Sequence, residues 1–225
     1  MRHPVSSACR WRAVLFDLDG TFADTAPDLA AALNHVRAAH GRPPLPLAEL
    51  RPMASHGARG LLQVGFGLGP DDDGYEALRV EFLARYADAI CVHTRLYDGI
   101  QPLLDALQRR ALPWGIVTNK ATALTLPLLD ALALRPSPGC VVCGDTAARP
   151  KPAPDPLLHA AARLGVDAAD CVYLGDDLRD MQAARAAGMS AAAVAYGYGA
   201  GTEPAQWGAD FVLAHPRELL ARLDG

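Results

Sequence analysis

The chain has 225 residues, of which 51% are apolar and 20% are charged, and its formal net charge is −4. This composition excludes an intrinsically disordered chain, because the apolar fraction is sufficient for a core, and it excludes collagen-like or low-complexity sequence, because Gly and Pro show no period. The weak negative charge gives no reason to expect a nucleic acid or a membrane as partner, and the length favours one core domain with an insert.

The first predicted element is a strand over 13–16, where Ala-Val-Leu-Phe forms a continuous apolar run that stops at Asp17. Continuous rather than alternating apolarity is typical of a strand buried on both faces of a parallel sheet. Residues 25–93 lack any such run and show helical spacing instead, which predicts an all-helical insert. We expect Asp24 to cap its first helix. The first expected helix begins after Pro27-Asp28, and further helices are expected over 57–66 and 75–89.

From residue 100 onward, apolar strands alternate with helical segments, which predicts a parallel α/β sheet with helices on its faces. We therefore expect a Rossmann-like core over 1–24 and 94–225, with an α-helical cap over 25–93 inserted into it. The expected strands in this part cover 114–117, 140–143, 171–174, 191–195 and 211–213, and the expected helices cover 100–110, 121–132, 154–164 and 180–187.

The cysteines and the apolar stretches indicate a reduced protein without a membrane anchor. Five cysteines, at positions 9, 91, 140, 143 and 171, are not typical of a disulfide framework in a chain of this length. The lone Cys140-Val141-Val142-Cys143 lacks the second Cys/His pair of a zinc site, so we interpret both thiols as buried. No secretion signal precedes the first strand, and the Ala-rich stretch from Ser190 to Gly201 is too short to span a bilayer. These observations favour a cytoplasmic protein.

Polar residues follow the predicted strands at the points where they end. Asp17 and Asp19 follow the first strand, Thr118 follows the second, and Asp176 follows a later one. Because sites in open α/β sheets form outside the carboxyl ends of the strands, we expect these side chains to gather there. Neighbouring carboxylates need a compensating cation, and ligands that are all oxygen suit Mg²⁺.

Four motifs with this placement resemble those of the haloacid dehalogenase superfamily of phosphatases. They occur in the order of that family, and the resemblance covers the whole chain, including a helical cap between the first and second motifs. The matching segments are Phe16-Asp17-Leu18-Asp19-Gly20-Thr21, Thr118-Asn119-Lys120, Lys151-Pro152 and Gly175-Asp176-Asp177-Leu178-Arg179-Asp180. One departure is Phe22, where the family usually has Leu or Val; it is still apolar.

The resemblance implies a phosphatase mechanism and a set of catalytic residues. Asp17 would attack phosphorus and carry a transient aspartyl-phosphate, while Asp19 would protonate the leaving oxygen and then activate water. Asp17, Asp176 and the backbone carbonyl of Asp19 would hold Mg²⁺ as the cofactor. Thr118 and Lys151 would bind the phosphoryl oxygens of the substrate and would contact the same oxygens during catalysis.

Four further residues have two interpretations each. Asn119 would contact the phosphate or serve only as a cap. Arg59, in the cap loop 55–60, would bind a substrate carboxylate or be an exposed helix cation. Asp177 and Asp180 would order a metal-bound water or Lys151, or would simply begin the next helix, where acidic residues favour the helix dipole.

Within the superfamily, the chain resembles the phosphoglycolate phosphatase group, and in it the branch that acts on N-acetylmuramic acid 6-phosphate. The expected partner is a small phosphate ester, with neither nucleic acid nor membrane involved and with a monomer or homodimer as the assembly. Phosphoglycolate is the alternative substrate, and a sugar phosphomutase is the next alternative activity. A dehalogenase would need neither Asp19 nor Mg²⁺, and a receiver-type signalling module would not need a cap. The branch resemblance rests on 55–60, 76–86, 92–93, 114–120, 175–180, 196–198, 207–210 and 215–216.

Overall fold

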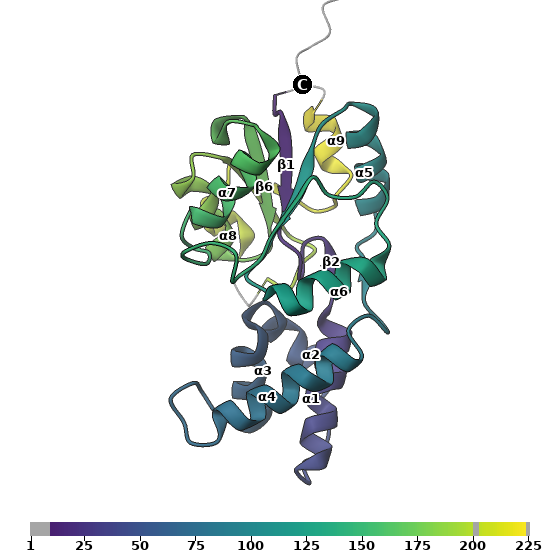
Figure 1. Ribbon diagram of the computed structural model, residues 1–225, viewed down its shortest axis with the longest axis vertical. Coiled ribbons are helices and arrows are strands. Elements are labelled where there is room, and N and C mark those ends of the chain that lie inside the picture. The colour runs from purple at the N-terminus through teal and green to yellow at the C-terminus, as the bar shows by residue number, and fades with distance from the viewer. Residues whose placement is uncertain (1–9, 200–202, 224–225) are drawn as a thin grey trace, which may run out of the picture.

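The computed structural model describes residues 10–199 and 203–223, so the predictions that concern Cys9 and Gly201 lie outside the described residues. Figure 1 shows a sheet flanked by helices and, below it, a separate group of helices. The described cysteines, at 91, 140, 143 and 171, are free thiols, and the last three are buried. None of the helices in the described ranges combines the length and apolarity that crossing a bilayer requires.

A six-stranded parallel sheet forms the core, in the order β5-β4-β1-β6-β7-β8, and confirms the predicted fold class. The order reverses at β1, so β1 lies between β4 and β6 and all three strands end at the same edge. The strands are β1 (Ala13–Phe16), β4 (Trp114–Val117), β5 (Cys140–Val142), β6 (Cys171–Gly175), β7 (Ser190–Val194) and β8 (Phe211–Leu213).

Both faces of the sheet are covered, which explains the continuous apolarity of β1. Successive residues of a strand point to opposite faces, and Val14 and Phe16 pack in one apolar cluster while Ala13 and Leu15 pack in another. The first face carries α5 (Ile100–Arg109), α6 (Thr122–Leu132) and α9 (Glu218–Leu223), and the second carries α7 (Asp155–Leu164) and α8 (Leu178–Ala186) (Figure 1). Short 3-10 turns cover Ala168–Asp170 and Pro204–Gln206.

The helices over 26–88 form the helical cap, which has an apolar cluster of its own. Leu33, Leu61 and Phe82 are fully buried in that cluster. Tyr198, from the loop after β7, reaches up into it, so the cap rests on the core through that loop. The cap contains α1 (Ala26–Ala39), α2 (Leu47–Leu50), a 3-10 helix (Arg51–His56), α3 (Gly57–Phe66) and α4 (Tyr75–Asp88).

The chain enters and leaves the cap through a two-stranded antiparallel ribbon that the sequence analysis does not predict. In it, β2 (Ala23–Asp24) pairs with β3 (Arg95–Leu96). The prediction that Asp24 caps α1 is wrong, because Asp24 forms an ion pair with Arg51 at 2.7 Å instead. The first turn of α1 is satisfied from the core, since the Tyr198 hydroxyl accepts hydrogen bonds from the backbone N–H groups of Thr25 and Ala26.

Buried Asp28 fixes the return of the chain to the core. Its carboxylate accepts hydrogen bonds from the backbone N–H groups of 92, 93 and 94 and from the Thr94 hydroxyl, at 2.7 to 3.0 Å. We expect Asp28→Ala to lower the free energy of unfolding by about 2–4 kcal/mol, because it leaves several buried donors without a partner. Thermal unfolding should show a fall in Tm of roughly 5–15 °C.

The matched control for this prediction is Asp73→Ala, because Asp73 is exposed on the turn before α4. Its Tm should change little, since substitutions of exposed turn residues have small effects. If Asp28→Ala and Asp73→Ala melted at the same temperature, the Asp28 contacts would contribute nothing to stability.

Candidate active site

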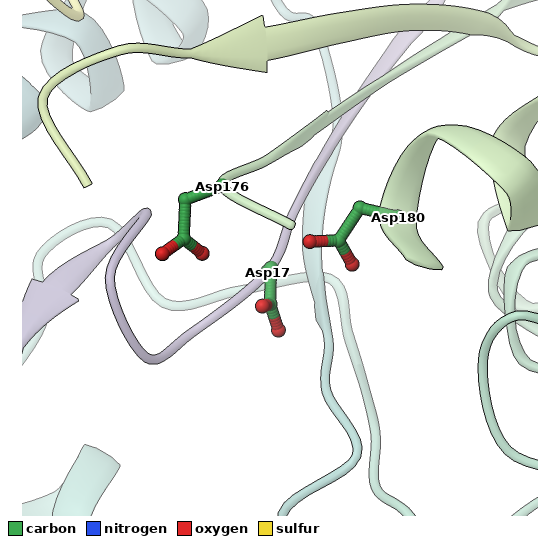
Figure 2. Close-up of side chains that lie close together, drawn as sticks. All are labelled: Asp17, Asp176 and Asp180. Atoms are coloured by element: carbon green, nitrogen blue, oxygen red, sulfur yellow. The ribbon is translucent and has the colours of Figure 1, made fainter. Parts of the chain in front are cut away.

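Three carboxylates meet at the carboxyl edge of the sheet, as Figure 2 shows. Asp17 follows β1, Asp176 follows β6, and Asp180 lies in the first turn of α8. One oxygen from each lies within 4.8 Å of the others. The paired parallel strands β1 and β6 place Asp17 beside Asp176, and the short connection from β6 to α8 brings Asp180 to the same point.

Lys151 is the cation that contacts this cluster. Its Nζ lies 2.8 Å from Asp17 Oδ1 and 2.7 Å from Asp180 Oδ1, and it donates to the Tyr173 hydroxyl at 2.7 Å. The side chain is buried. The surrounding acceptors restrict the flexible lysine side chain and so fix the position of its ammonium group. The structure thus supports the interpretation that Asp180 orders Lys151.

Asn119 positions the backbone of Lys151. Its side-chain Nδ2 donates to the Lys151 carbonyl at 2.9 Å, and its Oδ1 accepts from the Lys151 N–H at 2.9 Å. These two hydrogen bonds connect the segment after β4 to the loop that carries Lys151. Asn119 also lines the cavity described below. Its predicted contact with phosphate stays a prediction, while its contact with Lys151 is a feature that the sequence analysis missed.

Asp19 lies in a separate ion pair on the same side of the chain as Asp17. Lys120 Nζ is 3.0 Å from Asp19 Oδ1, and the Thr25 hydroxyl donates to the same oxygen. Burial lowers the pKa of Lys120, but the neighbouring Asp19 outweighs it and raises the pKa above its usual value. Lys120 therefore stays protonated and holds the Asp19 side chain in place through this ion pair. Lys120 was part of a predicted motif but had no predicted role.

The two interpretations of Asp177 and Asp180 are compatible in the structure. Asp177 is the N-cap of α8 and accepts from the Arg179 N–H, while Asp180 Oδ2 accepts from the Asp177 N–H, which completes a capping box. Because the other oxygen of Asp180 faces Lys151, one carboxylate both begins the helix and orients the lysine. The Asp-x-x-Asp spacing is enough to predict the capping box, but not the contact with Lys151.

The electrostatics of the cluster indicate a cation site. Burial raises the pKa of Asp17 to about 7, although Lys151 opposes that shift. Burial, with Asp17 and Asp180 nearby, also raises the pKa of Asp176. The Lys151 ammonium group contacts two of the three carboxylates, Asp17 and Asp180, and a divalent cation with oxygen ligands would balance the remaining charge. The donor set therefore fits Mg²⁺, with Asp17 and Asp176 as carboxylate ligands.

This burial predicts how the stability of the metal-free protein depends on pH. The folded state binds the Asp17 proton up to about pH 7, whereas an unfolded Asp loses it near its usual pKa of about 4. Stability should therefore fall as pH rises from about 4 to about 7, with an upper limit near 4 kcal/mol. Urea unfolding at pH 5 and pH 8 with a chelator measures the difference. Asp17→Asn should reduce it, and Mg²⁺ should restore the stability of the wild type at pH 8. An unchanged pH dependence in Asp17→Asn would contradict this assignment.

A cavity of about 290 Å³ opens between the core and the cap. Its polar end contains Asp17, Asp19, Thr118 and Lys151, so the structure brings the four predicted catalytic residues together. Aliphatic and aromatic side chains from the cap helices and α6 line the cavity, as do the end of the 3-10 helix and the first turn of α3. The lining also includes Leu29, Ser55, His56, Ala58, Phe82, Leu83, Tyr86, Leu124, Asp177, Arg179 and Asp180.

Arg59 is not among the residues that line this cavity. It lies in the first turn of α3 and is exposed. The arginine that does line the cavity is Arg179, from α8 of the core. The sequence analysis expects a contact loop over 55–60, but this segment is the end of the 3-10 helix and the first turn of α3, and its residues Ser55, His56 and Ala58 line the cavity. It could not determine whether Arg59 lies on the face of α3 toward the cavity or on the face toward solvent, because the sequence of this helix does not distinguish the two faces at its first turn.

Comparisons with known proteins show the family of this chain. The family model of the haloacid dehalogenase-like hydrolases matches residues 14–194. The chain is 46% identical over 216 residues to the N-acetylmuramic acid 6-phosphate phosphatase of Pseudomonas aeruginosa, with 96% of each chain covered. It is 45% identical over 209 residues to a phosphoglycolate phosphatase of Xanthomonas campestris pv. campestris, with 92% of this chain and 94% of the relative covered.

Solved structures show the same architecture. A protein from Haemophilus somnus, described as a predicted phosphoglycolate phosphatase, superposes with a TM-score of 0.84 at 25% identity, and the match covers 94% of this chain and 97% of that one. CbbY from Rhodobacter sphaeroides, in complex with xylulose-(1,5)bisphosphate, superposes with a TM-score of 0.76 at 26% identity over 96% of this chain and 100% of its own. The chain therefore belongs to the haloacid dehalogenase-like hydrolase family, among its phosphatases.

Proposed function

We propose that this phosphatase hydrolyses N-acetylmuramic acid 6-phosphate, with Mg²⁺ as cofactor and an aspartyl-phosphate intermediate on Asp17. The observation that carries the proposal is the lining of the cavity, which combines the catalytic residues with apolar side chains in its wall, among them Leu29, Phe82 and Tyr86. Such a wall suits the carbon face of a sugar ring. Binding sites for ligands of ordinary organic size have volumes of about 300–1,000 Å³, which is close to the volume here.

In the proposed reaction, Asp17 attacks phosphorus while the bond from phosphorus to the ester oxygen breaks. Asp19 gives its proton to the departing oxygen, so the sugar leaves as an alcohol. Water then attacks the aspartyl-phosphate, Asp19 takes the proton of that water, and Asp17 and inorganic phosphate are released. The Asp17 and Asp19 side chains line one cavity, as both steps require.

The other residues act by position and charge. Lys151 lies 2.8 Å from Asp17 and supplies positive charge where the phosphoryl oxygens would lie. Thr118 is buried at the end of β4 and lines the same end of the cavity. When bound by Asp17, Asp176 and the Asp19 carbonyl, Mg²⁺ would supply further charge neutralisation for the phosphoryl group. The cap covers this end and limits the access of bulk water.

Steady-state phosphate release in the presence of Mg²⁺ tests the proposal. We expect kcat/KM for N-acetylmuramic acid 6-phosphate to exceed that for 2-phosphoglycolate by well over tenfold, because only the sugar can occupy the apolar wall. Asp17→Asn serves as the blank. The opposite preference would show that the phosphoglycolate relatives share their substrate with this chain, and phosphate transfer between glucose phosphates would indicate a mutase. Either result would reject the proposed substrate.

A further inference from the structure

Arg179 is a cation of the cavity that has no part in the reaction steps above. Lys151 pairs with Asp17 and Asp180, and Lys120 pairs with Asp19. Arg179 instead lies where α8 of the core meets the 3-10 helix of the cap, because its Nη2 donates to the backbone carbonyl of Ser55 at 2.9 Å. It therefore lies at the junction of core and cap, where part of the leaving group would be held.

The hydrogen bonds of Arg179 fix the guanidinium and leave one nitrogen available. Nε and Nη2 bind the two Asp177 oxygens at 2.9 Å each, in a two-pronged ion pair. This pair orients the planar group and removes most of its rotational freedom. A guanidinium has five donors, and within residues 10–199 and 203–223 Nη1 donates no hydrogen bond. A preorganised donor with two free hydrogens is suited to an anionic oxygen.

A buried polar atom without a partner lies near Arg179 in the lining of the cavity. His56 follows Ser55 and lines the cavity, and its Nδ1 is buried with no hydrogen bond to any described residue. Burial and the nearby Arg179 lower the pKa of His56, so the imidazole is neutral at pH 7. A buried polar atom without a partner is costly unless a ligand or water satisfies it. This wall is therefore polar at the junction and apolar along the cap helices.

We propose that Arg179, through Nη1, binds the carboxylate of the leaving group and so determines the preference for carboxylated substrates. This inference rests on the proposed function, because it assumes a phosphate ester whose leaving group carries a carboxylate. It replaces Arg59, which is exposed and does not line the cavity, as the carboxylate-binding residue. Arg179 and Asp180 both belong to α8, so one rigid helix would position the carboxylate of the substrate relative to its phosphate.

Two amino-sugar phosphates that differ in the carboxylate provide the test. N-acetylmuramic acid 6-phosphate carries a lactyl carboxylate that N-acetylglucosamine 6-phosphate lacks. We expect the wild type to prefer the first, and Arg179→Gln to reduce the ratio of the two kcat/KM values by about 10- to 100-fold, the value of one or two hydrogen bonds to a charged group. The loss should lie mainly in KM for the carboxylated substrate. Arg179→Lys should retain part of the preference.

Arg59→Gln is the matched variant, and its substrate ratio should remain that of the wild type. A reduced ratio in Arg59→Gln with an unchanged ratio in Arg179→Gln would assign the carboxylate to Arg59 and overturn the inference. Equal losses on both sugars in Arg179→Gln would place this arginine at the phosphate, and they would also overturn it. Thermal unfolding verifies that each variant is folded.

The failure of the proposed function is visible in the wild type alone. If the wild type hydrolysed 2-phosphoglycolate far better than either sugar phosphate, the proposed substrate would be wrong. The role of Arg179 would then be measured with 2-phosphoglycolate against ethyl phosphate, which lacks the carboxylate. An unchanged ratio in Arg179→Gln for that pair would overturn the inference on its own terms.

Discussion

Replacing Asp17 with Asn should reduce phosphate release by about 10⁴-fold or more, because an amide cannot act as the nucleophile that forms the aspartyl-phosphate. The substitution keeps the size of the side chain and removes one charge from a cluster of three buried carboxylates. Lys151 retains Asp180 and Tyr173 as partners, so the loop that carries it should keep its position. The expected result is a folded, inactive protein.

Two measurements distinguish this expectation from a general loss of structure. The Tm of Asp17→Asn in metal-free buffer should equal or exceed that of the wild type, because a costly buried charge is lost. Mass spectrometry of rapidly quenched wild type should detect a phosphoryl adduct on the peptide that contains Asp17, and Asp17→Asn should carry none. Activity within tenfold of the wild type would reject Asp17 as the nucleophile.

Asp19→Asn should have the second largest effect, a loss of about 10² to 10⁴-fold with alkyl phosphates, the usual contribution of general acid–base catalysis. An amide can neither protonate the leaving oxygen nor accept the proton of the attacking water. Lys120 and the Thr25 hydroxyl would still have an oxygen acceptor in the amide. The environment that holds position 19 in place is therefore largely kept.

The leaving group separates the two roles of Asp19. p-Nitrophenolate leaves without a proton, so the first step should stay fast in Asp19→Asn while the second step slows. We expect rapid mixing to show a burst of about one p-nitrophenolate per protein, followed by slow turnover. A sugar phosphate should give no burst. Equal loss on both substrates without a burst would contradict the assignment of Asp19 as acid and base.

The positions that could be predicted from the sequence are those fixed by local pattern. The run over 13–16 indicates a doubly buried strand, and the structure confirms it. The same holds for the residues that directly follow strands, because the topology of a parallel sheet leaves them only one edge to occupy. Asp17, Thr118 and Asp176 reach that edge for this reason.

The features that the sequence analysis missed depend on contacts between distant segments. The pairing of β2 with β3 involves two residues on each side and about 70 residues of intervening chain, which is too short a pattern to have a period. Tyr198 caps α1 from the other end of the chain, and no motif connects them. Arg179 and Arg59 are both arginines near a plausible site, and only the packing of α3 and α8 decides which one faces the cavity.

The ribbon of β2 and β3 has a consequence for how substrate preference can change. The chain leaves the core for the cap and returns to it at two adjacent points, so the cap helices are one long insertion at a single place on the core surface. Such an insertion can be lengthened, shortened or exchanged without altering the order of the sheet strands. A chimera with an exchanged cap would keep the nucleophile Asp17 and the neighbouring Lys151 unchanged. Because Arg179 belongs to the core, a chimera with another cap would have new cap side chains in its cavity wall but would keep Arg179. Its preference for substrates with a carboxylate should therefore persist.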